Sequence, residues 1–577
     1  MDNVYAERIS ALRARMASKN WDAVVISGSD PHGSEYPAPR WRQVEWLSGF
    51  TGEAGDLVIT AGHAGLWTDT RYFIQAREQL IDTGVELHKT RIPGQVLIPQ
   101  WLASEAFRGR NTVNIAVDGL CQSVESVSDI EKAFDEETEV RIVNVPDLLD
   151  CIWTDRPPVP ETPIFELSDE DMGESSDDRI EWLRAFLRDN GCDSMLVCAL
   201  DEIAWLLGVR ASDIEYNPLV ISYLLVTSDE VKWFVRDNYN DVFLTLNDVE
   251  GRMYVDSSQL NYHIYKMLDR GRLVCGPSPV QLRKAVKNPV EIAGMRQAHL
   301  LDGIAMEKFL FWLEAEVSSG RPVSEWDAAC RIGTYRAGME GSMGDSFETI
   351  SAYGGSAALP HYVTPRVNSP MLRAEGLYLC DSGGQYVCGT TDITRTVPLG
   401  PCSGLEKEDY TLVLKGHIDL AMAVFPKGTA GCQIDALARE PLWKHLRNFG
   451  HGTGHGVGCF LCVHEGPQDI RQNFNAQPLL PGMICSDEPG IYREGMHGVR
   501  HENLLLCREE GSNEFGEWLG FEPLTFCHFD TGALLAELLT GEEIEWLNAY
   551  NARVYDTLSP LLPPEVASWL SDKTKPI

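Results

Sequence analysis

The stretch YLCDSGGQYVCGTTDITRT, Tyr378 to Thr396, carries two aspartates on either side of a turn-prone centre. Asp381 and Asp392 stand 11 positions apart, and the β-like arms around SGGQYVCG predict a hairpin centred near Tyr386. Such a hairpin would bring the two carboxylates together. An acidic residue taken alone is more often a solvated strand end than a ligand, so this pair needs further partners.

A second stretch, MICSDEPGIYREGMHGVRHENLLL from Met483 to Leu506, repeats the arrangement with glutamates. Glu488 and Glu502 are 14 positions apart around Gly495, and a second hairpin would pair them in the same way. Two hairpins can therefore converge two carboxylate pairs on one site.

The glycine-rich segment GHGTGHGVG, Gly450 to Gly458, holds two histidines four positions apart. Neither the P-loop nor the dinucleotide-binding spacing fits its glycines, and alternating glycines disfavour a zinc-binding helix. If the segment is extended, His451 and His455 share a face but lie on the order of 13 Å apart. We therefore expect one histidine to bind a metal and the other to meet substrate.

The balance of charge narrows the set of partners. The 577 residues include 49 basic and 85 acidic side chains, a net charge of −36 that would repel nucleic acid and anionic membranes. The start, MDNVYAERISALRARM, lacks the apolar core of a signal peptide, and no later run reaches the length of a spanning helix. We expect a cytoplasmic protein whose 15 cysteines are mostly reduced thiols.

The amino-terminal half reads as an internal duplication. RISALRARMASKNWDAVVISGSD begins at Arg8 and RIEWLRAFLRDNGCDSMLVCALD at Arg179, and an offset of 171 is kept by Arg8/Arg179, Leu12/Leu183, Arg13/Arg184, Asp22/Asp193 and Asp30/Asp201. Each copy passes from an amphipathic helix pattern into an apolar β-like run, which predicts two α/β modules. The proline-rich residues 154–163 and the acidic residues 166–178 between them are expected to form an irregular linker.

The clustered chemistry lies after a second boundary. Asn288-Pro289 precedes a long helical pattern, and both carboxylate stretches and the glycine loop follow it. From about Gly511 the sequence predicts two helices and a strand, for packing or for oligomerisation.

Taken together, these segments resemble the Xaa-Pro aminopeptidases (aminopeptidase P), which share a "pita-bread" catalytic fold with prolidase, methionine aminopeptidase and creatinase. The family's five metal ligands match DSGGQY, GTTDITRT, GTGHGVG, DEPG and RHEN, at Asp381, Asp392, His455, Glu488 and Glu502. SGSDPHGSEY, DEIAWLLGVR and FEPLTF look like the long, three-domain cytosolic form. The resemblance implies an α/β (α+β) chain of two creatinase-N-like domains and a pita-bread domain with a C-terminal extension from about 511, with bounds 1–155, 156–285 and 286–577.

The resemblance also implies a cofactor. Asp392 and Glu502 would bridge two divalent ions, Asp381 would complete one, and His455 with Glu488 the other. Four carboxylates and one imidazole suit Mn²⁺, with Co²⁺ or Zn²⁺ acceptable.

Further site residues follow from the same resemblance. His361 in LPHYV, His451 and His464 in VHEGP would contact the substrate and its developing oxyanion, and Glu488 would carry a proton to the leaving nitrogen. Tyr492 and Arg500 would orient the carboxylates. For Arg500, a plain surface ion pair remains the alternative.

The expected activity is hydrolysis of the Xaa-Pro bond at the amino terminus of peptides whose second residue is proline, by a homodimer. The alternatives are a prolidase, which cleaves only Xaa-Pro dipeptides, and a silent binding protein on the same fold. Cys388, where an Asp is expected, most simply fills space in its hairpin; the alternative is a thiol that captures soft metals or makes the protein sensitive to oxidation. The C-x-x-C of Cys459 and Cys462 is weak evidence for zinc or redox chemistry, because no second pair accompanies it.

Overall fold

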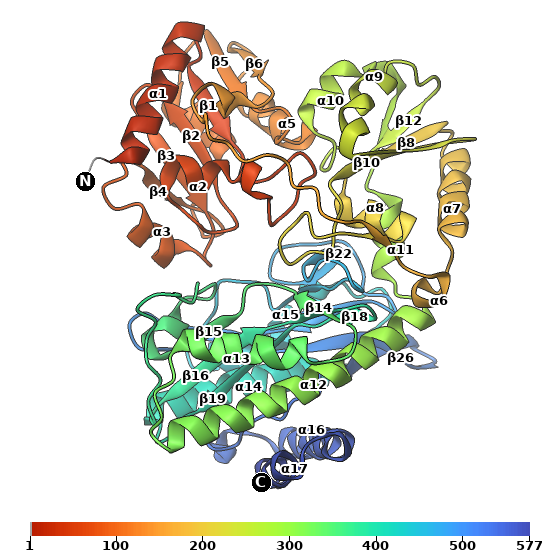
Figure 1. Cartoon of the computed structure of the whole chain (residues 1–577). Helices are drawn as coiled ribbons and strands as arrows, with labels where there is room; N and C mark the ends of the chain where they lie inside the picture. Colours follow the sequence, from red (N-terminus) through yellow and green to blue (C-terminus); the bar gives the residue numbers. More distant parts are fainter. Residues whose placement is uncertain (1–2) are drawn as a thin grey trace. The chain divides into compact units, whose positions relative to one another are not determined.

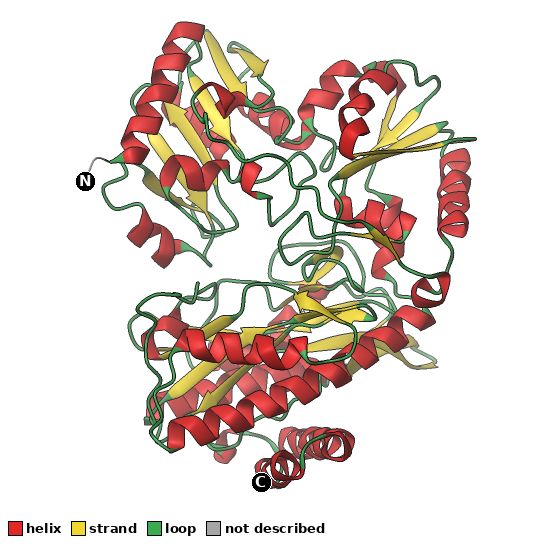
Figure 2. Ribbon diagram, in the orientation of Figure 1, coloured by secondary structure: helices red, strands yellow, loops and turns green. Residues whose placement is uncertain are grey.

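The computed structural model describes residues 3–577 and forms two compact units. The first unit comprises the residues up to Leu167 with Glu174–Val280, and the second comprises Ser168–Gly173 with Gln281–Ile577. Both units contain helices and strands (Figures 1 and 2), in agreement with the predicted α/β (α+β) class. Among the helices of residues 3–577, none combines the length and apolar character needed to cross a membrane.

The first sheet of the first unit has the strand order β4-β3-β2-β1-β5-β6. Helix α1 (Val4–Lys19) leads into its central strand, and the apolar side chains of that helix and of the strands form one core cluster. The strands are β1 (Ala23–Ile26), β2 (Asp56–Thr60), β3 (Ala64–Thr68), β4 (Glu86–Lys89), β5 (Thr112–Val117) and β6 (Glu139–Asn144).

The second sheet repeats this plan in the order β11-β10-β8-β12-β13. In both sheets the central strand has an antiparallel neighbour on one side and a parallel neighbour on the other. The elements are α7 (Ser176–Asp189), β8 (Ser194–Val197), β10 (Ser222–Thr227), β11 (Val231–Val235), β12 (Met253–Val255) and β13 (Leu273–Cys275).

The predicted internal duplication is confirmed by the structure. Each end of β8 lies 171 residues after the matching end of β1. Arg13 Nε donates to the carbonyl of Thr60, and its counterpart Arg184 Nε donates to the carbonyl of Thr227, both at 2.9 Å. The repeated arginines therefore tie the leading helix of each copy to the equivalent strand end.

The acidic part of the expected linker is more regular than predicted. Residues 154–163 contain no helix or strand, but the next residues form β7 (Phe165–Glu166) and α6 (Asp169–Met172) before α7 begins. Ser168 and Ser175 cap α6 and α7 through their side chains. Serine caps and first-turn acids stabilise a helix N-terminus, which outweighs the high charge of the segment.

The second unit is built around the long helix α12 (Pro289–Ser318), which Asn288 and Glu291 start with a reciprocal capping box. In Figure 1 this helix and α13 (Glu325–Ala337) lie along the strands of the unit. The strands form a sheet β15-β16-β19 and a larger one, β20-β27-β26-β23-β21-β22. Bounds are β15 (Ile350–Tyr353), β16 (Leu377–Ser382), β19 (Ile393–Pro398), β20 (Phe425–Pro426), β21 (Gly454–Gly456), β22 (Glu465–Ile470), β23 (Ile484–Asp487), β26 (Asn503–Asn513) and β27 (Gly516–Pro523), with α14 (Gly404–Ala421) and α15 (Asp435–Lys444).

Both predicted hairpins are present. β16 pairs antiparallel with β19, and β17 (Gly384–Tyr386) pairs with β18 (Gly389–Thr390) around a turn at Val387 and Cys388. β24 (Gly490–Arg493) pairs antiparallel with β25 (His497–Arg500). The carboxylates therefore lie at or beside the bases of the two hairpins.

The carboxyl-terminal residues pack within their own unit. The predicted strand and two helices are β27, α16 (Gly541–Leu558) and α17 (Pro564–Lys573). Apolar residues of both helices, including Leu547, Leu558 and Leu570, join a core cluster with α14. Of the two roles considered for this extension, packing is the one seen in the structure.

A buried arginine on β19 ties this extension to the hairpins. Arg395 Nη1 donates to the carbonyl of Glu502 at 2.6 Å, while Nη2 and Nε donate to the carbonyls of Cys527 and His528 at 2.7 and 3.1 Å. Its Nη2 also lies 3.1 Å from the Tyr550 hydroxyl on α16. One side chain thus satisfies polar groups from three segments.

We predict that Arg395→Leu destabilises the second unit, because it leaves several buried oxygens without a donor at about 1–3 kcal/mol each. The melting temperature should fall by on the order of 5 °C or more. Arg296→Leu is the matched control, since Arg296 is half-exposed and pairs with Glu522 near the surface; its change should stay within about 1 °C. Similar melting temperatures for both variants would contradict the role of Arg395.

Candidate metal centre

The four predicted carboxylate ligands converge in the second unit. Asp381 is the penultimate residue of β16, Asp392 directly precedes β19, and Glu502 directly precedes β26. One ligand atom from each of Asp381, Asp392 and Glu502 lies within 4.8 Å of the other two, and the same holds for His455, Glu488 and Glu502. The two triads share Glu502, so the residues form two adjoining groups rather than one.

The short strand β21 presents His455 to these carboxylates. Its Nε2 lies 3.4 Å from Glu488 Oε1 and 3.5 Å from Asp392 Oδ2. The other ring nitrogen, Nδ1, lies 3.0 Å from the carbonyl of Gly456, which accepts its hydrogen. This contact fixes the tautomer in which the Nε2 lone pair faces the carboxylates.

The glycines of this loop allow close approach rather than a long strand. Only residues 454–456 of the expected extended segment are in a strand. A Cβ on Gly454 would lie 1.9 Å from the carbonyl oxygen of Ser486, and one on Gly456 would lie 2.4 Å from that of Glu465. Both neighbouring strands can therefore lie against β21 only because these positions are glycine.

His451 and His455 have different partners, as expected. His451 Nε2 lies 2.7 Å from the Tyr492 hydroxyl, and Nδ1 lies 2.7 Å from the carbonyl of Gly452. Burial, followed by the nearby charge of Arg500, lowers the pKa of His451 well below its usual value. His451 is therefore neutral, and its Nε2 accepts a hydrogen bond from the Tyr492 hydroxyl.

Arg500 connects this chain to the carboxylates. Its Nη1 donates to the Tyr492 hydroxyl at 2.7 Å, and its Nη2 pairs with Asp381 Oδ2. The alternative of a surface ion pair is wrong, since Arg500 is 2 % exposed. Arg500 holds Asp381 and Tyr492 at fixed positions on opposite sides of its guanidinium.

The other two predicted histidines border the same site. The His464 ring lies edge-on to His455 with centroids 4.3 Å apart, and a ligand atom of His464 lies within 4.8 Å of Asp392 and His455. His361 lies close enough to His451 for a positive charge on the His361 ring to lower the pKa of His451. The structure thus brings all ten predicted site residues to one region of the second unit.

Two supporting residues were not predicted. Thr394 Oγ1 donates to Glu502 Oε2 at 2.7 Å; its place two positions after Asp392, on the same face of a strand, was an available signal. Glu325 accepts hydrogen bonds from the Tyr362 hydroxyl and the Tyr353 amide, both at 2.7 Å, and so anchors the loop that carries His361. No local pattern distinguishes Glu325 from an ordinary first-turn helix acid.

The electrostatics of the cluster fit divalent cations. Burial, with repulsion from neighbouring carboxylates, raises the pKa of Glu488 to about 7 and that of Glu502 well above its usual value, and burial also raises that of Asp381. Asp381 Oδ1 is buried without a hydrogen-bond partner. Oxygen donors concentrated in this way, with one imidazole, match the preferences of hard to borderline divalent ions.

The cysteines do not join this cluster. All 15 lie within residues 3–577 and are free thiols. Cys388 sits in the β17–β18 turn, where its carbonyl accepts from Cys459 Sγ at 3.5 Å, and burial raises the pKa of its thiol. The Gly458 amide donates to the Cys462 carbonyl at 2.9 Å, so the C-x-x-C closes a tight turn.

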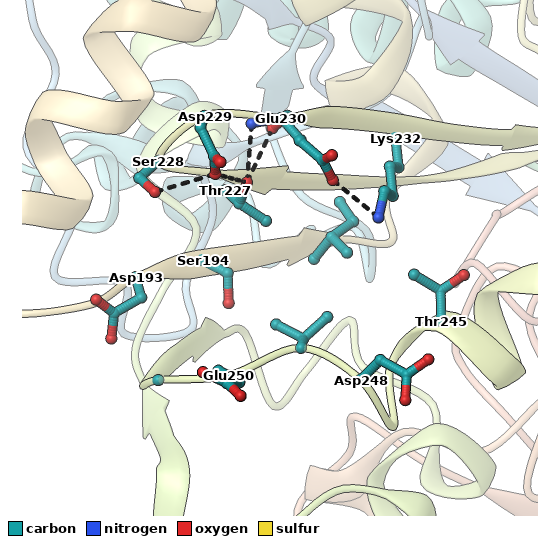
Figure 3. Close-up of a pocket in the computed structure, with 13 residues that line it drawn as sticks. Asp193, Ser194, Thr227, Ser228, Asp229, Glu230, Lys232, Thr245, Asp248 and Glu250 are labelled. Atoms are coloured by element: carbon teal, nitrogen blue, oxygen red, sulfur yellow. Dashed lines mark hydrogen bonds and ion pairs between the residues drawn. The ribbon is translucent and has the colours of Figure 1, made fainter.

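An open cleft of about 680 Å³ in the first unit is a weaker candidate site. Acidic side chains dominate its lining, as Figure 3 shows for Asp193, Asp229, Asp248 and Glu250. Lys232, the one cation among the lining residues, pairs with Glu230 at 2.8 Å. Acidic groups at an open surface are ordinarily solvated, so this cleft does not compete with the buried cluster.

Models of known protein families match four segments of the chain. The model of metallopeptidase family M24 matches residues 293–509, which include all ten site residues. The Creatinase/Prolidase N-terminal domain matches twice, at residues 8–152 and 155–291. The C-terminal region of the M24 peptidases matches residues 517–577.

Individual relatives match over the full length. Aminopeptidase P1 of Arabidopsis thaliana is 36% identical over 99% of both chains, and Xaa-Pro aminopeptidase 2 of Homo sapiens is 36% identical over 99% of this chain and 88% of its own. The crystal structure of an X-prolyl aminopeptidase from Caenorhabditis elegans, described as a cytosolic enzyme with a di-nuclear active site, matches with a TM-score of 0.95 and 34% identity over 99% of this chain and 100% of that one. A prolidase from Pyrococcus horikoshii OT3, 22% identical over 61% of this chain, shares the fold alone.

The fold and the buried cluster are those of a pita-bread metallopeptidase. Within that class, the chain belongs to the Xaa-Pro aminopeptidase family, also called aminopeptidase P.

We predict that metal stabilises this enzyme more at about pH 8 than at about pH 6. In the metal-free protein, a carboxyl group with a raised pKa stabilises the fold while protonated, and this contribution is lost as pH rises through about 7 for Glu488. Bound cations favour the ionised form instead. The measurement is the melting temperature of Mn²⁺-saturated and EDTA-treated protein at both pH values.

The expected difference is on the order of 1 kcal/mol per carboxyl group and pH unit. Equal stabilisation at both pH values, or greater stabilisation at the lower one, would contradict the raised carboxyl pKa values.

Proposed function

We propose that this protein releases the first residue from peptides in which proline stands second, using the cluster described above. The observation that carries the proposal is the pair of adjoining triads that share Glu502. Asp381, Asp392, His455, Glu488 and Glu502 are the proposed ligands, and Mn²⁺ is the proposed ion because oxygen donors dominate the set. Two ions held there would acidify a water molecule and polarise the scissile carbonyl.

Glu488 is the proposed proton carrier. It is less buried than Glu502, with a side chain that is 19% exposed, so its carboxylate is accessible to a bound peptide. It takes a proton from the attacking water and delivers it to the proline nitrogen as the C–N bond breaks. The leaving nitrogen needs this proton, because an amide anion is a poor leaving group and proline departs as a neutral secondary amine.

The outer histidines and the arginine chain position the reacting groups. We propose that His361 and His464 contact the peptide and stabilise the developing oxyanion. His451 does so while hydrogen-bonded to Tyr492, and Arg500 keeps Tyr492 and Asp381 in place. This chain is supported by consecutive contacts of 2.7 Å from His451 to Tyr492 and from Tyr492 to Arg500.

The remaining assignments extend the family likeness to the whole molecule. We propose the three-domain division at residues 1–155, 156–285 and 286–577, a homodimer, and a cytoplasmic location. The repeated sheets support the first two domains, and the description of the nematode relative as cytosolic supports the location.

The substrate preference is tested with Mn²⁺-supplemented protein and parallel peptides, followed by mass spectrometry. We predict release of the first residue from Xaa-Pro-Yaa-Zaa peptides and no cleavage of a matched Xaa-Ala peptide. Cleavage restricted to the Xaa-Pro dipeptide would identify a prolidase. An intact set of peptides despite bound metal would identify a binding protein.

A second prediction concerns Glu488. Glu488→Gln should lower kcat by about 10²–10⁴-fold, because the amide cannot carry the proton. Glu494→Gln is the matched control, since Glu494 is exposed in the turn of the same hairpin and should keep wild-type activity. Metal content is measured for each variant. An active Glu488→Gln enzyme would exclude the proton-carrier role.

A further inference from the structure

A separate cluster of metal-ligating side chains lies in the first unit, at the edge of its first sheet. His63 directly precedes β3, and Glu86 and His88 belong to the edge strand β4. One ligand atom from each of the three lies within 4.8 Å of the other two. None of the ten residues assigned to peptide hydrolysis takes part.

The strand register places these side chains on one face. β3 and β4 run parallel, with Gly65 opposite Glu86 and Trp67 opposite His88. Alternation along a strand points residues 65, 67, 86 and 88 to the same side. A Cβ on Gly65 would lie 2.5 Å from His63 Nε2 and 2.8 Å from the ring carbon Cδ2 of His88. The glycine therefore leaves the space that the two imidazoles occupy.

The geometry of the imidazole pair suits one shared ion. The Nε2 atoms of His63 and His88 are 3.1 Å apart, and their rings are inclined by 78°. Two nitrogens bound to one ion at 2.0–2.1 Å are separated by about 2.9–3.4 Å for octahedral to tetrahedral angles. The pair can thus accept an ion between its nitrogens with small ring movements.

Aromatic neighbours hold both rings in this arrangement. Trp67 stacks on His88 with centroids 3.8 Å apart and planes inclined by 7°. Trp101, at the end of α4 (Ile98–Trp101), lies 4.6 Å from His63 between ring centroids. Rings fixed in advance lose little freedom when they bind a ligand.

The surrounding charges favour a cation. Glu86 Oε2 lies 3.7 Å from His63 Nδ1, and Glu105 adds a second nearby negative charge. The charge of Arg13 opposes a cation at His63, but those of Glu86 and Glu105 favour it. An imidazole is mostly uncharged at neutral pH and then keeps the lone pair that metal binding requires.

We propose that His63, His88 and Glu86 form a binding site for a divalent ion of the Zn²⁺, Ni²⁺ or Cu²⁺ class, additional to the catalytic ions. Two imidazoles and one carboxylate favour these ions over Mn²⁺, in contrast to the carboxylate-rich centre of the second unit. The ion would pin the edge strand β4 to the end of β3. The described part of the second sheet has no counterpart of β4, so the site belongs to the first copy alone.

The test counts zinc bound to the full chain. Wild type, His63→Asn and His88→Asn are stripped with EDTA, dialysed against Zn²⁺, desalted, and analysed by inductively coupled plasma mass spectrometry. We expect each variant to hold about one zinc ion fewer per chain than wild type. His445→Asn is the matched control, because His445 is an exposed imidazole 3.2 Å from Glu408 Oε1, and it should match wild type.

Circular dichroism and Mn²⁺-dependent peptide cleavage, both expected to be unchanged, show that the variants are folded. A folded variant with the wild-type zinc count would overturn the proposal. Since the readout is a difference in zinc between variants, it holds whether or not the peptidase assignment is correct. A second measurement is Zn²⁺-induced thermal stabilisation of the Mn²⁺-loaded protein, expected in wild type and His445→Asn and absent from the other two variants.

Discussion

The mutual repulsion of four clustered carboxylates, three buried and that of Glu488 partly exposed, is the constraint on which the second unit depends. Asp381, Asp392, Glu488 and Glu502 carry up to four negative charges in a space from which water is largely excluded, and one guanidinium, that of Arg500, contacts them. Burying such charges unpaired costs several kcal/mol each. The raised pKa values of this cluster express that cost. Bound cations offset this cost. Relief of the repulsion in the metal-free fold therefore contributes to the free energy of metal binding.

Carboxylates that repel one another must be held in place by a rigid part of the fold. Here they are held mainly by the backbone of paired strands. Asp381 is the penultimate residue of a paired strand, and Asp392 and Glu502 directly precede paired strands. Glu488 lies between β23 and β24, and its amide donates to the Thr453 carbonyl at 2.7 Å. Arg395 then joins the carbonyls of Glu502, Cys527 and His528, so the carboxyl-terminal extension braces the strand ends that carry the ligands. Ligands held by strands are placed more accurately than ligands on loops. In this protein the carboxyl-terminal extension helps to keep those strand ends in position.

The sequence was sufficient for whatever is encoded over short distances. The hairpin that brings Asp381 close to Asp392 follows from turn-prone residues between β-like arms. The internal duplication follows from the constant offset between matching residues. What it did not predict depends on contacts over long distances: the carbonyl partners of Arg395 at Glu502 and His528 lie 107 and 133 positions away. The role of Glu325 likewise rests on a loop folded back against its helix. The prediction of an irregular linker at α6 was wrong for a different reason. The high charge of the segment argued against a helix, although Ser168 is a helix N-cap.

The duplicated sheets show which parts of a module can change. Arg8 and Arg179 donate to the carbonyls of Trp46 and Trp205 and lie 4.3 and 4.0 Å over their rings, because each copy must tie its leading helix to the same neighbour. Those inner contacts are fixed by packing in both copies. The sheet edges are not, because an edge strand has a neighbour on one side only. The first copy adds β4, with its histidine pair beside β3, and the second ends at β11, beside an acidic cleft. These two differences lie at the sheet edges, where new side chains can gather without disturbing the core.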